Sequence, residues 1–345
     1  MSERRVVVLG ASGYGGGELL RLLAQHPERP LVRGVSRSYA GKPFHAVHPN
    51  LRGVLQGTFD ANVDWAWLSE SDKPVLFCAM PHGELSQQYK TLAASAPGET
   101  WRRLTLIDLS ADFRIHDVDL YKRFYKVEHP CPDEIPAFTY GFCEWQHDSI
   151  KAAKRIANPG CFATALQLAL LPLAKHQVGL IAVSGVTGSS GSGMKLAETT
   201  HHPTRAHDFR AYKALGHQHQ AEAIQLMLAL GVDGELGFVP HSAPIVRGIF
   251  LTVQLAGVGD VRAKFEKAYA AAPFVRLVEE SPRLASVVGS NFVDIGFATQ
   301  GKVTAIMVAL DNLVKGMAGQ AIQNMNLATG LDERAGLWSA AAYPA

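Results

Sequence analysis

The residue best placed for covalent chemistry is Cys161, in residues 156–164 with the sequence Ile-Ala-Asn-Pro-Gly-Cys-Phe-Ala-Thr. Pro159 and Gly160 precede it and an apolar helical stretch follows, so the pattern predicts that Cys161 lies at or near a helix N-terminus. The helix dipole and unpaired N–H groups there favour a thiolate, which can attack carbon. The alternative is a small buried side chain, which suits Cys78 in mid-strand.

A glycine-rich turn near the start of the chain predicts a nucleotide site. It lies between the apolar run 6–9 and a helical pattern from residue 18, as in strand–turn–helix units. Glycines there allow backbone N–H groups and the helix N-terminus to approach a pyrophosphate. The alternative is a merely tight turn. The residues that we assign to cofactor binding are Gly10, Ser12, Gly13, Tyr14, Gly15 and Gly16.

The end of the second predicted strand, residues 31–35, indicates which dinucleotide is bound. NAD-binding folds usually place an acidic residue there, to accept hydrogen bonds from the adenosine ribose. This chain has Ser36, Arg37 and Ser38 instead. Two hydroxyls and a guanidinium suit a 2′-phosphate, so the sequence favours NADP over NAD, unless Arg37 is a solvated surface residue.

The elements around these residues predict an α/β domain followed by a mixed one. Strand candidates at 6–9, 31–35, 75–79 and 104–109, with a helical stretch at 84–94, are typical of a parallel, doubly wound sheet. Residues 115–149 have a mostly irregular pattern. From residue 180 onward, longer strand patterns predominate at 181–186, 248–255, 291–297 and 303–310, with helices near 220–230 and 261–271, and a last helix is expected at 313–326.

Composition narrows the class of protein. The 345 residues carry a formal net charge of +2, too small to indicate nucleic acid or an anionic membrane as the main partner. No apolar run is long enough to span a bilayer, and the first residues lack a signal-peptide pattern, so we expect a cytoplasmic protein. The four cysteines show no CxxC pairing, which indicates reduced thiols.

Residues 156–165, continued by Ala-Leu-Leu-Pro at 169–172, resemble the active-site signature of the N-acetyl-γ-glutamyl-phosphate reductases of arginine biosynthesis. Further segments resemble that family in the same order over nearly the whole chain. They are Gly-Ala-Ser-Gly-Tyr (10–14), His-Pro-Asn-Leu (48–51), Leu-Ser-Ala-Asp-Phe-Arg (109–114), His-His-Pro (201–203), Gly-His-Gln-His (216–219) and Asp-Asn-Leu-Val-Lys-Gly (311–316).

The resemblance implies a Rossmann domain joined to a mixed α+β catalytic domain of the semialdehyde/glyceraldehyde-3-phosphate dehydrogenase type. We expect residues 1–157 and 313–345 to form the NADP-binding domain, and residues 158–312 the catalytic and oligomerisation domain of a homo-oligomer. The implied reaction is displacement of phosphate from an acyl phosphate by Cys161, followed by reduction of the thioester to a semialdehyde by NADPH.

The resemblance also places the remaining site residues. It implies a base in the segment 216–219, where we favour His217, with His219 close behind. Arg114 and Arg247, and less strongly Arg205, are candidates for binding substrate anions, although each is also a candidate for a structural ion pair. Ser189, in the glycine-rich segment 188–193, is expected near the nicotinamide or the substrate phosphate.

Two further expectations concern Asn312 and metal ions. The related dehydrogenases place an amide on the nicotinamide at the position of Asn312, and a helix N-cap is its other role. His201, His202 and His207, with the pair at 217 and 219, match no zinc-ligand spacing, so we expect no metal.

The substrate remains open at this stage. A sister group acts on LysW-linked aminoadipyl phosphate, one methylene longer; residues 48–53 and 220–222 favour it, whereas residues 158–162 favour the arginine enzymes. A pocket separates such substrates by only about 1–3 kcal/mol. The alternatives from other classes are a non-catalytic NADP-binding regulator and a cysteine hydrolase.

Overall fold

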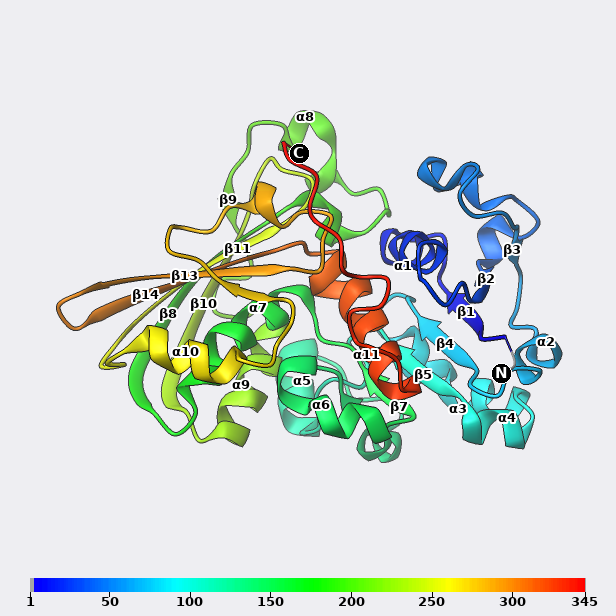
Figure 1. Cartoon of the computed structure of the whole chain (residues 1–345), viewed down its shortest axis with the longest axis horizontal. Coiled ribbons are helices and arrows are strands. Elements are labelled where there is room, and N and C mark those ends of the chain that lie inside the picture. The colour runs from blue at the N-terminus through cyan, green and yellow to red at the C-terminus, as the bar shows by residue number, and fades with distance from the viewer. Residues whose placement is uncertain (1–2, 345) are drawn as a thin grey trace. The chain divides into compact units, whose positions relative to one another are not determined.

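The computed structural model describes residues 3–344. They form two compact units, each built around a seven-stranded sheet (Figure 1). The first unit contains the described residues up to 122, with 127–159 and 317–338, and the second contains 123–126, 160–316 and the described residues from 339. The long segment 160–316 of the second unit has its limits at 159/160 and 316/317, a few residues from the boundaries expected at 157/158 and 312/313.

The first unit is a doubly wound α/β domain. Its strands run parallel in the order β3-β2-β1-β4-β5-β7-β6, which is the Rossmann arrangement extended by β7 and β6. The strands are β1 (Arg5–Leu9), β2 (Leu31–Val35), β3 (Phe59–Asp60), β4 (Val75–Cys78), β5 (Thr105–Asp108), β6 (Thr139–Tyr140) and β7 (Arg155–Ala157). The four strands expected from the apolar runs are therefore present, and β3, β6 and β7 are additional.

Helices of the first unit connect these strands and pack against the sheet. The expected helix at 84–94 is α3 (Glu84–Ser95), and α11 (Gly319–Thr329) lies against β5 although it follows the second unit in sequence. The other helices assigned to this unit are α1 (Tyr14–Ala24), α2 (Trp65–Ser69), α4 (Gly98–Arg103) and α6 (Cys143–Ala152), and α5 (Val118–Tyr125) lies at the boundary of residues 122/123.

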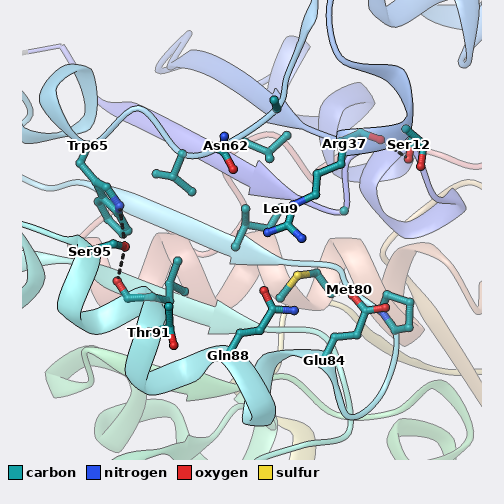
Figure 2. A pocket seen from close by; sticks show the side chains of 18 residues that line it. Leu9, Ser12, Arg37, Asn62, Trp65, Met80, Glu84, Gln88, Thr91 and Ser95 are labelled. Carbon is teal, nitrogen blue, oxygen red and sulfur yellow. Dashed lines mark hydrogen bonds between the residues drawn. The ribbon is translucent and has the colours of Figure 1, made fainter.

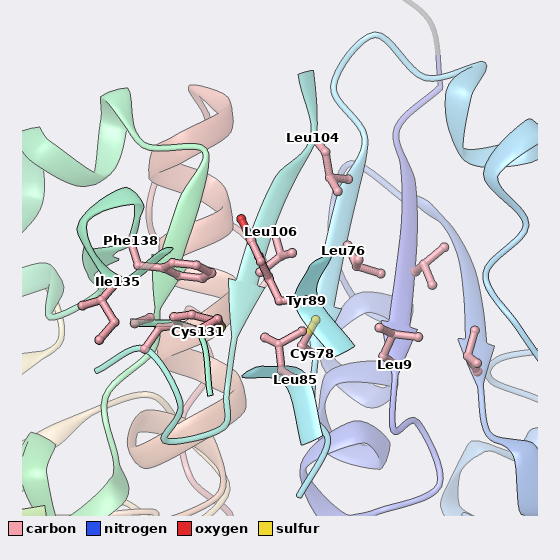
Figure 3. Packing of buried hydrophobic residues seen from close by; sticks show 14 of the residues in the cluster. Leu9, Leu76, Cys78, Leu85, Tyr89, Leu104, Leu106, Cys131, Ile135 and Phe138 are labelled. Carbon is pink, nitrogen blue, oxygen red and sulfur yellow. The ribbon is translucent and has the colours of Figure 1, made fainter. Parts of the chain in front are cut away.

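The core of the first unit explains why its strands read as continuous apolar runs. Both faces of β4 and β5 are buried, and Leu76, Cys78 and Leu106 contribute to one apolar cluster with Tyr89 of α3 and Phe138 of the segment before β6 (Figure 3). Burial raises the pKa of Cys78 well above its usual value, so this thiol stays protonated. The interpretation of Cys78 as a buried side chain is confirmed.

The second unit is a mixed sheet with helices, in the order β12-β13-β14-β11-β8-β10-β9. The four expected strand segments are β8 (Gln177–Thr187), β11 (Ile249–Ala256), β13 (Val293–Gln300) and β14 (Val303–Leu310). Its helices are α7 (Cys161–Leu170), α8 (His202–Arg205), α9 (His219–Leu230) and α10 (Val261–Tyr269), and the strands not expected are β9 (Arg210–Ala211), β10 (Asp233–Ser242) and β12 (Val275–Leu277).

The last expected helix, at 313–326, is divided in the structure. A π-helical turn (Val314–Ala318) precedes α11, which continues to Thr329. Gly316 and Met317, where the chain passes from the second unit to the first, lie in this π-turn.

Candidate active site

The glycine turn between β1 and α1 is packed too tightly for side chains at two positions. Gly10 has φ +71°, and a Cβ there would lie 2.4 Å from the carbonyl oxygen of Ala79. A Cβ on Gly16 would lie 2.5 Å from the carbonyl oxygen of Gly10. The turn therefore needs glycine at these positions, and it leaves the N-terminus of α1 beside the carboxyl ends of β1 and β4.

His48 supports the same turn from outside. Its Nε2 lies 2.8 Å from the carbonyl oxygen of Ala11, and its ring fills the space beside Gly17, where a Cβ would come within 2.5 Å. Burial lowers the pKa of His48, so the neutral ring donates to Ala11 at neutral pH. This contact gives the His-Pro-Asn-Leu segment a structural role.

A cavity of about 640 Å³ opens beside this turn, at the carboxyl ends of β1, β2 and β4 (Figure 2). Strand order reverses between β1 and β4, which is where open α/β sheets bind dinucleotides. Five predicted cofactor residues line the cavity: Gly10, Ser12, Ser36, Arg37 and Ser38. Gly13, Tyr14, Gly15 and Gly16 belong to the turn and the start of α1 and are not among the lining residues.

The opposite wall of this cavity was not found from the sequence. It comes from α3 and from the start of α2, where Trp65 Nε1 donates to Ser95 Oγ at 3.1 Å and fixes the indole (Figure 2). No local motif marks these residues. The lining residues contributed by this wall and by the loop after β3 are Ala61, Asn62, Val63, Trp65, Glu84, Gln88, Thr91, Leu92 and Ser95.

The end of β2 carries hydroxyls and one guanidinium, as the sequence indicates. Ser36 Oγ donates to Ser12 Oγ at 2.9 Å, which ties the residue after β2 to the glycine turn. Arg37 is exposed and extends toward the cavity (Figure 2). Across the described residues no carboxylate forms a salt bridge with it. The glycine turn, the cavity and the guanidinium of Arg37 are therefore suited to binding a dinucleotide, which carries phosphate groups.

Cys161 is the first residue of α7, with Gly160 as the N-cap, so the expected helix N-terminus is confirmed. The other three cysteines are buried, whereas Cys161 is partly accessible. Burial also raises the pKa of Cys131 to about 11, which keeps that thiol protonated. Cys161 is therefore the cysteine whose position and exposure suit a nucleophile.

Arg114 supports the segment that precedes Cys161. It is buried in the first unit, where its Nε donates to the carbonyl oxygen of Asn158 at 2.7 Å and its Nη2 to that of Leu109 at 2.8 Å. Asn158 is itself buried, and its Nδ2 donates to the carbonyl oxygen of Met317 at 3.1 Å. These bonds give Arg114 a structural role, and its predicted role in substrate binding remains a prediction.

His217 and His219 both lie in the second unit, with their ring centroids 4.8 Å apart. The stretch is not extended, because His219 begins α9. His217 is buried against the rings of Phe162 and Tyr212. Burial, and secondarily the charge of Lys213, lower the pKa of His217 to about 4, so it is neutral at neutral pH.

The hydrogen bond to His217 fixes which of its nitrogens carries the proton. Nδ1 accepts from the backbone N–H of His219 at 3.2 Å, so the neutral ring carries its hydrogen on Nε2. In this tautomer His217 can donate from Nε2 but has no free lone pair to take a proton there.

His219 and Glu222 of α9 lie against Gly160, the residue before the nucleophile. A Cβ on Gly160 would come within 2.5 Å of His219 Nε2 and 2.8 Å of Glu222 Oε1. Glu222 is fully buried, and its Oε2 accepts the backbone N–H of Gly160 at 3.0 Å. Glu222 was not identified from the sequence, where one carboxylate in a helix resembles a surface residue.

A second cavity, of about 410 Å³, lies in the second unit and contains Cys161. Both histidines line it, and three cationic side chains do so as well: Arg205, Arg210 and Lys213. The guanidinium of Arg205 is held by Ser242 Oγ and the carbonyl oxygen of Ala243. The remaining lining residues are Phe162, Thr187, Gly188, Gly191, Ser192, Thr199, Thr200, Tyr212, Gln218 and Ser242.

Three other predicted residues surround this cavity without lining it. Arg247 Nη1 lies 3.4 Å from Asp311 Oδ2, and Ser189 donates its backbone N–H to Ile245 O at 2.9 Å. Asn312 is buried; its Oδ1 accepts Gly248 N–H at 2.7 Å and its Nδ2 donates to Ser190 Oγ at 3.0 Å. The amide of Asn312 thus holds two loops of the second unit together.

Residues 3–344 contain neither a metal-binding group of side chains nor a helix that could span a membrane. No three His, Cys, Asp or Glu side chains gather in a group that could hold a metal ion. None of the described helices has both the length and the apolar character required to cross a membrane.

Comparison with known proteins identifies both units. Residues 5–153 match the semialdehyde dehydrogenase NAD-binding domain, and residues 161–312 match the semialdehyde dehydrogenase dimerisation domain. The chain is 42% identical to N-acetyl-gamma-glutamyl-phosphate reductase of Methanopyrus kandleri, covering 98% of this chain and 99% of that protein. It is 40% identical to the LysW-L-2-aminoadipate/LysW-L-glutamate phosphate reductase of Saccharolobus solfataricus, covering 96% of each.

Solved structures agree on the fold. Aspartate semialdehyde dehydrogenase II of Vibrio cholerae, complexed with ASA, superposes with a TM-score of 0.69 at 17% identity, covering 96% of this chain and 99% of that one. The expected combination of a Rossmann domain with a mixed α+β domain is confirmed. The chain belongs to the family of N-acetyl-γ-glutamyl-phosphate reductases and their LysW-linked sister reductases, which are enzymes of the semialdehyde dehydrogenase type.

Proposed function

We propose that this protein reduces N-acetyl-γ-glutamyl phosphate to N-acetylglutamate semialdehyde with NADPH, through a thioester on Cys161. The observation that carries the proposal is the cavity in which Cys161, at the N-terminus of α7, shares the walls with two histidines and three cations. The thiol suits attack on a carbonyl carbon, and the cations suit a substrate that carries phosphate and carboxylate.

The first step makes the thioester. The Cys161 sulfur forms a bond to the acyl carbon, the bond from that carbon to the phosphate oxygen breaks, and phosphate leaves with the electron pair. The dipole of α7, positive at its N-terminus, stabilises negative charge there. Arg205, Arg210 and Lys213 bind the anionic groups of the substrate, and these residues extend the predicted set of Arg114, Arg247 and Ser189.

The second step reduces the thioester. The cofactor, when bound by the glycine turn and residues 36–38, supplies the hydride for this reduction. The substrate oxygen takes up a proton as hydride adds to the carbon, and it gives up the same proton as the carbon–sulfur bond breaks, so the aldehyde is released and the thiolate of Cys161 is restored. The group that supplies and removes this proton must lie beside Cys161.

We assign the acid–base role to His219. Its imidazole lies against Gly160, next to the nucleophile, and the buried carboxylate of Glu222 lies on the same side. His217, neutral and protonated on Nε2, is suited to donate a hydrogen bond to the substrate oxygen. The order of preference between the two histidines is therefore the reverse of the one expected from the sequence.

We propose NADP rather than NAD as the cofactor, and substitution of Arg37 tests this preference. Arg37→Ala should raise KM for NADPH about 10- to 100-fold, because a charge-assisted bond to the 2′-phosphate is lost, while activity with NADH should not fall. Steady-state kinetics with both cofactors measure this. Arg52→Ala removes an exposed arginine of the same unit as the matched control. An unchanged ratio of the two KM values would remove Arg37 from the cofactor site.

A carrier-linked substrate is the second candidate, because relatives of similar identity carry both names. The decisive experiment compares kcat/KM for N-acetyl-γ-glutamyl phosphate, its aminoadipyl homologue and the LysW-linked forms of each. A higher kcat/KM for a LysW-linked form would show that the protein reduces a LysW-linked acyl phosphate instead. If the protein binds NADP but turns over none of these substrates in either direction, it is a non-catalytic NADP-binding regulator. Hydrolysis of a substrate without consumption of NADPH would indicate a cysteine hydrolase.

We also propose that the protein is a homo-oligomer that assembles through the second unit. The family model that matches residues 161–312 is described as a dimerisation domain. Large apolar side chains of this unit, including Leu196, Phe209 and Leu215, are exposed in the single chain. Association through such a surface removes apolar area from water.

A further inference from the structure

We propose that Gly316 is a positioning residue for the Cys161 thiol. Its missing side chain lets the segment 311–316, which we call the 311–316 turn, lie directly against the nucleophile. The proposal deepens the function proposed above, because it concerns how the same thiol is held.

The contact is close and involves rigid atoms. A Cβ built on Gly316 would lie 2.7 Å from the Cβ of Cys161 and 3.1 Å from its Cα. These atoms belong to the backbone and the first side-chain carbon, so no rotation of a flexible side chain relieves the clash. A methyl group at residue 316 must displace either the turn or Cys161.

The turn is the more firmly held of the two. Asp311 is fully buried, and its carboxylate accepts the backbone N–H groups of Leu313 at 2.7 Å, Val314 at 3.0 Å and Gly289 at 2.7 Å. The N–H of Gly316 bonds to the carbonyl oxygen of Asp311 at 2.9 Å. The turn also follows β14, which is paired on both sides by β11 and β13.

Lys315 fixes the turn further. It is fully buried, with its ammonium 5.7 Å from the centre of the Phe274 ring. Moving the turn would disturb a buried cation and several bonds to a buried carboxylate, which is costly. The displacement therefore falls mainly on Cys161.

Cys161 has little space for that displacement. The residue before it packs against His219 and Glu222, and the rest of α7 from Phe162 onward is buried. A shift of Cys161 therefore changes the position of Sγ relative to His219. A misplacement of about 1 Å can cost about 100-fold in rate.

Gly316→Ala tests the proposal in the full-length protein. We expect kcat to fall about 100-fold, with KM for NADPH unchanged, because the cofactor cavity is lined by residues 9–95. The rate at which iodoacetamide alkylates Cys161, measured against pH, should change as well, since this readout needs no turnover. Gly237→Ala is the matched control, because its Cβ would meet nothing nearer than 3.7 Å.

A double variant separates this contact from a general loss of stability. In the Cys161→Gly background the Cβ at 2.7 Å is absent, so adding Gly316→Ala should lower Tm much less than it does in the native chain. Should Gly316→Ala alone fail to fold, Cys161→Gly/Gly316→Ala should still fold and give this result. Equal Tm losses in both backgrounds, or unchanged alkylation in Gly316→Ala, would overturn the proposal.

The proposed function can fail independently. If the native chain reduces no acyl phosphate, the thioester reaction is wrong, yet the alkylation profile and the Tm comparison still report whether Gly316 positions the thiol.

Discussion

Cys161→Ser is expected to lower kcat at least about 10⁴-fold, because an alcohol at the start of α7 stays protonated at neutral pH and does not form the thioester. NADP affinity should not change, since the cofactor cavity is lined by residues of the first unit. Oxidation of NADPH in the presence of acyl phosphate measures the first quantity, and titration calorimetry with NADP measures the second.

Cys143→Ser provides the control for this substitution. Cys143 is buried, and its Sγ lies 3.2 Å from Asn324 Oδ1, so a serine hydroxyl can donate to the same acceptor. This variant should keep its activity. Substantial turnover by Cys161→Ser would show that the thiol is not the nucleophile, whatever the control does.

Glu222→Ala is expected to have the second largest effect, on both stability and activity. Removing the carboxylate leaves the buried N–H of Gly160 without its acceptor, which costs about 1–3 kcal/mol of the free energy of unfolding. It also removes the negative charge beside His219, so we expect kcat to fall about 100- to 1000-fold. Urea unfolding and steady-state kinetics on the same preparations measure both.

Two further variants separate the effect of Glu222→Ala on stability from its effect on kcat. Glu222→Gln keeps an oxygen that can accept the N–H of Gly160, so it should recover most of the stability while kcat stays low. Glu235→Ala removes an exposed carboxylate of the same unit and should change neither quantity. Full activity in Glu222→Gln would mean that Glu222 acts through the hydrogen bond alone.

The sequence predicted the elements whose patterns are locally uniform. The strands β2 and β14 were predicted with the bounds that they have, because apolar residues, several of them β-branched, predominate in both. The strand β10 was missed because Gly234, Gly237 and Pro240 lie inside it, and these residues weaken a strand pattern. Its neighbour β9 pairs with it at two residues, so Pro240 lies beside a short edge strand where a missing N–H is tolerated.

In the candidate site, too, residues within short motifs could be predicted from the sequence, whereas residues that act through tertiary contacts could not. Cys161, the glycine turn and residues 36–38 each carry their signal in a short segment, so the sequence could identify them. Glu222 could not be found in that way, because its function depends on burial against Gly160, which lies far away in sequence. The grouping of Arg210 and Lys213 with Cys161 likewise depends on the tertiary fold.

The discontinuous first unit has a consequence for synthesis on the ribosome. Asn324 of α11 donates to the carbonyl oxygen of Gly141 and to Oδ1 of Asn158, so the segment 317–338 completes a core begun by residues made much earlier. The second unit consists almost entirely of one continuous stretch, 160–316, which emerges before that segment. During translation the thiol-bearing unit can therefore become compact first, while the nucleotide-binding unit waits for α11, although its own strands are made earlier.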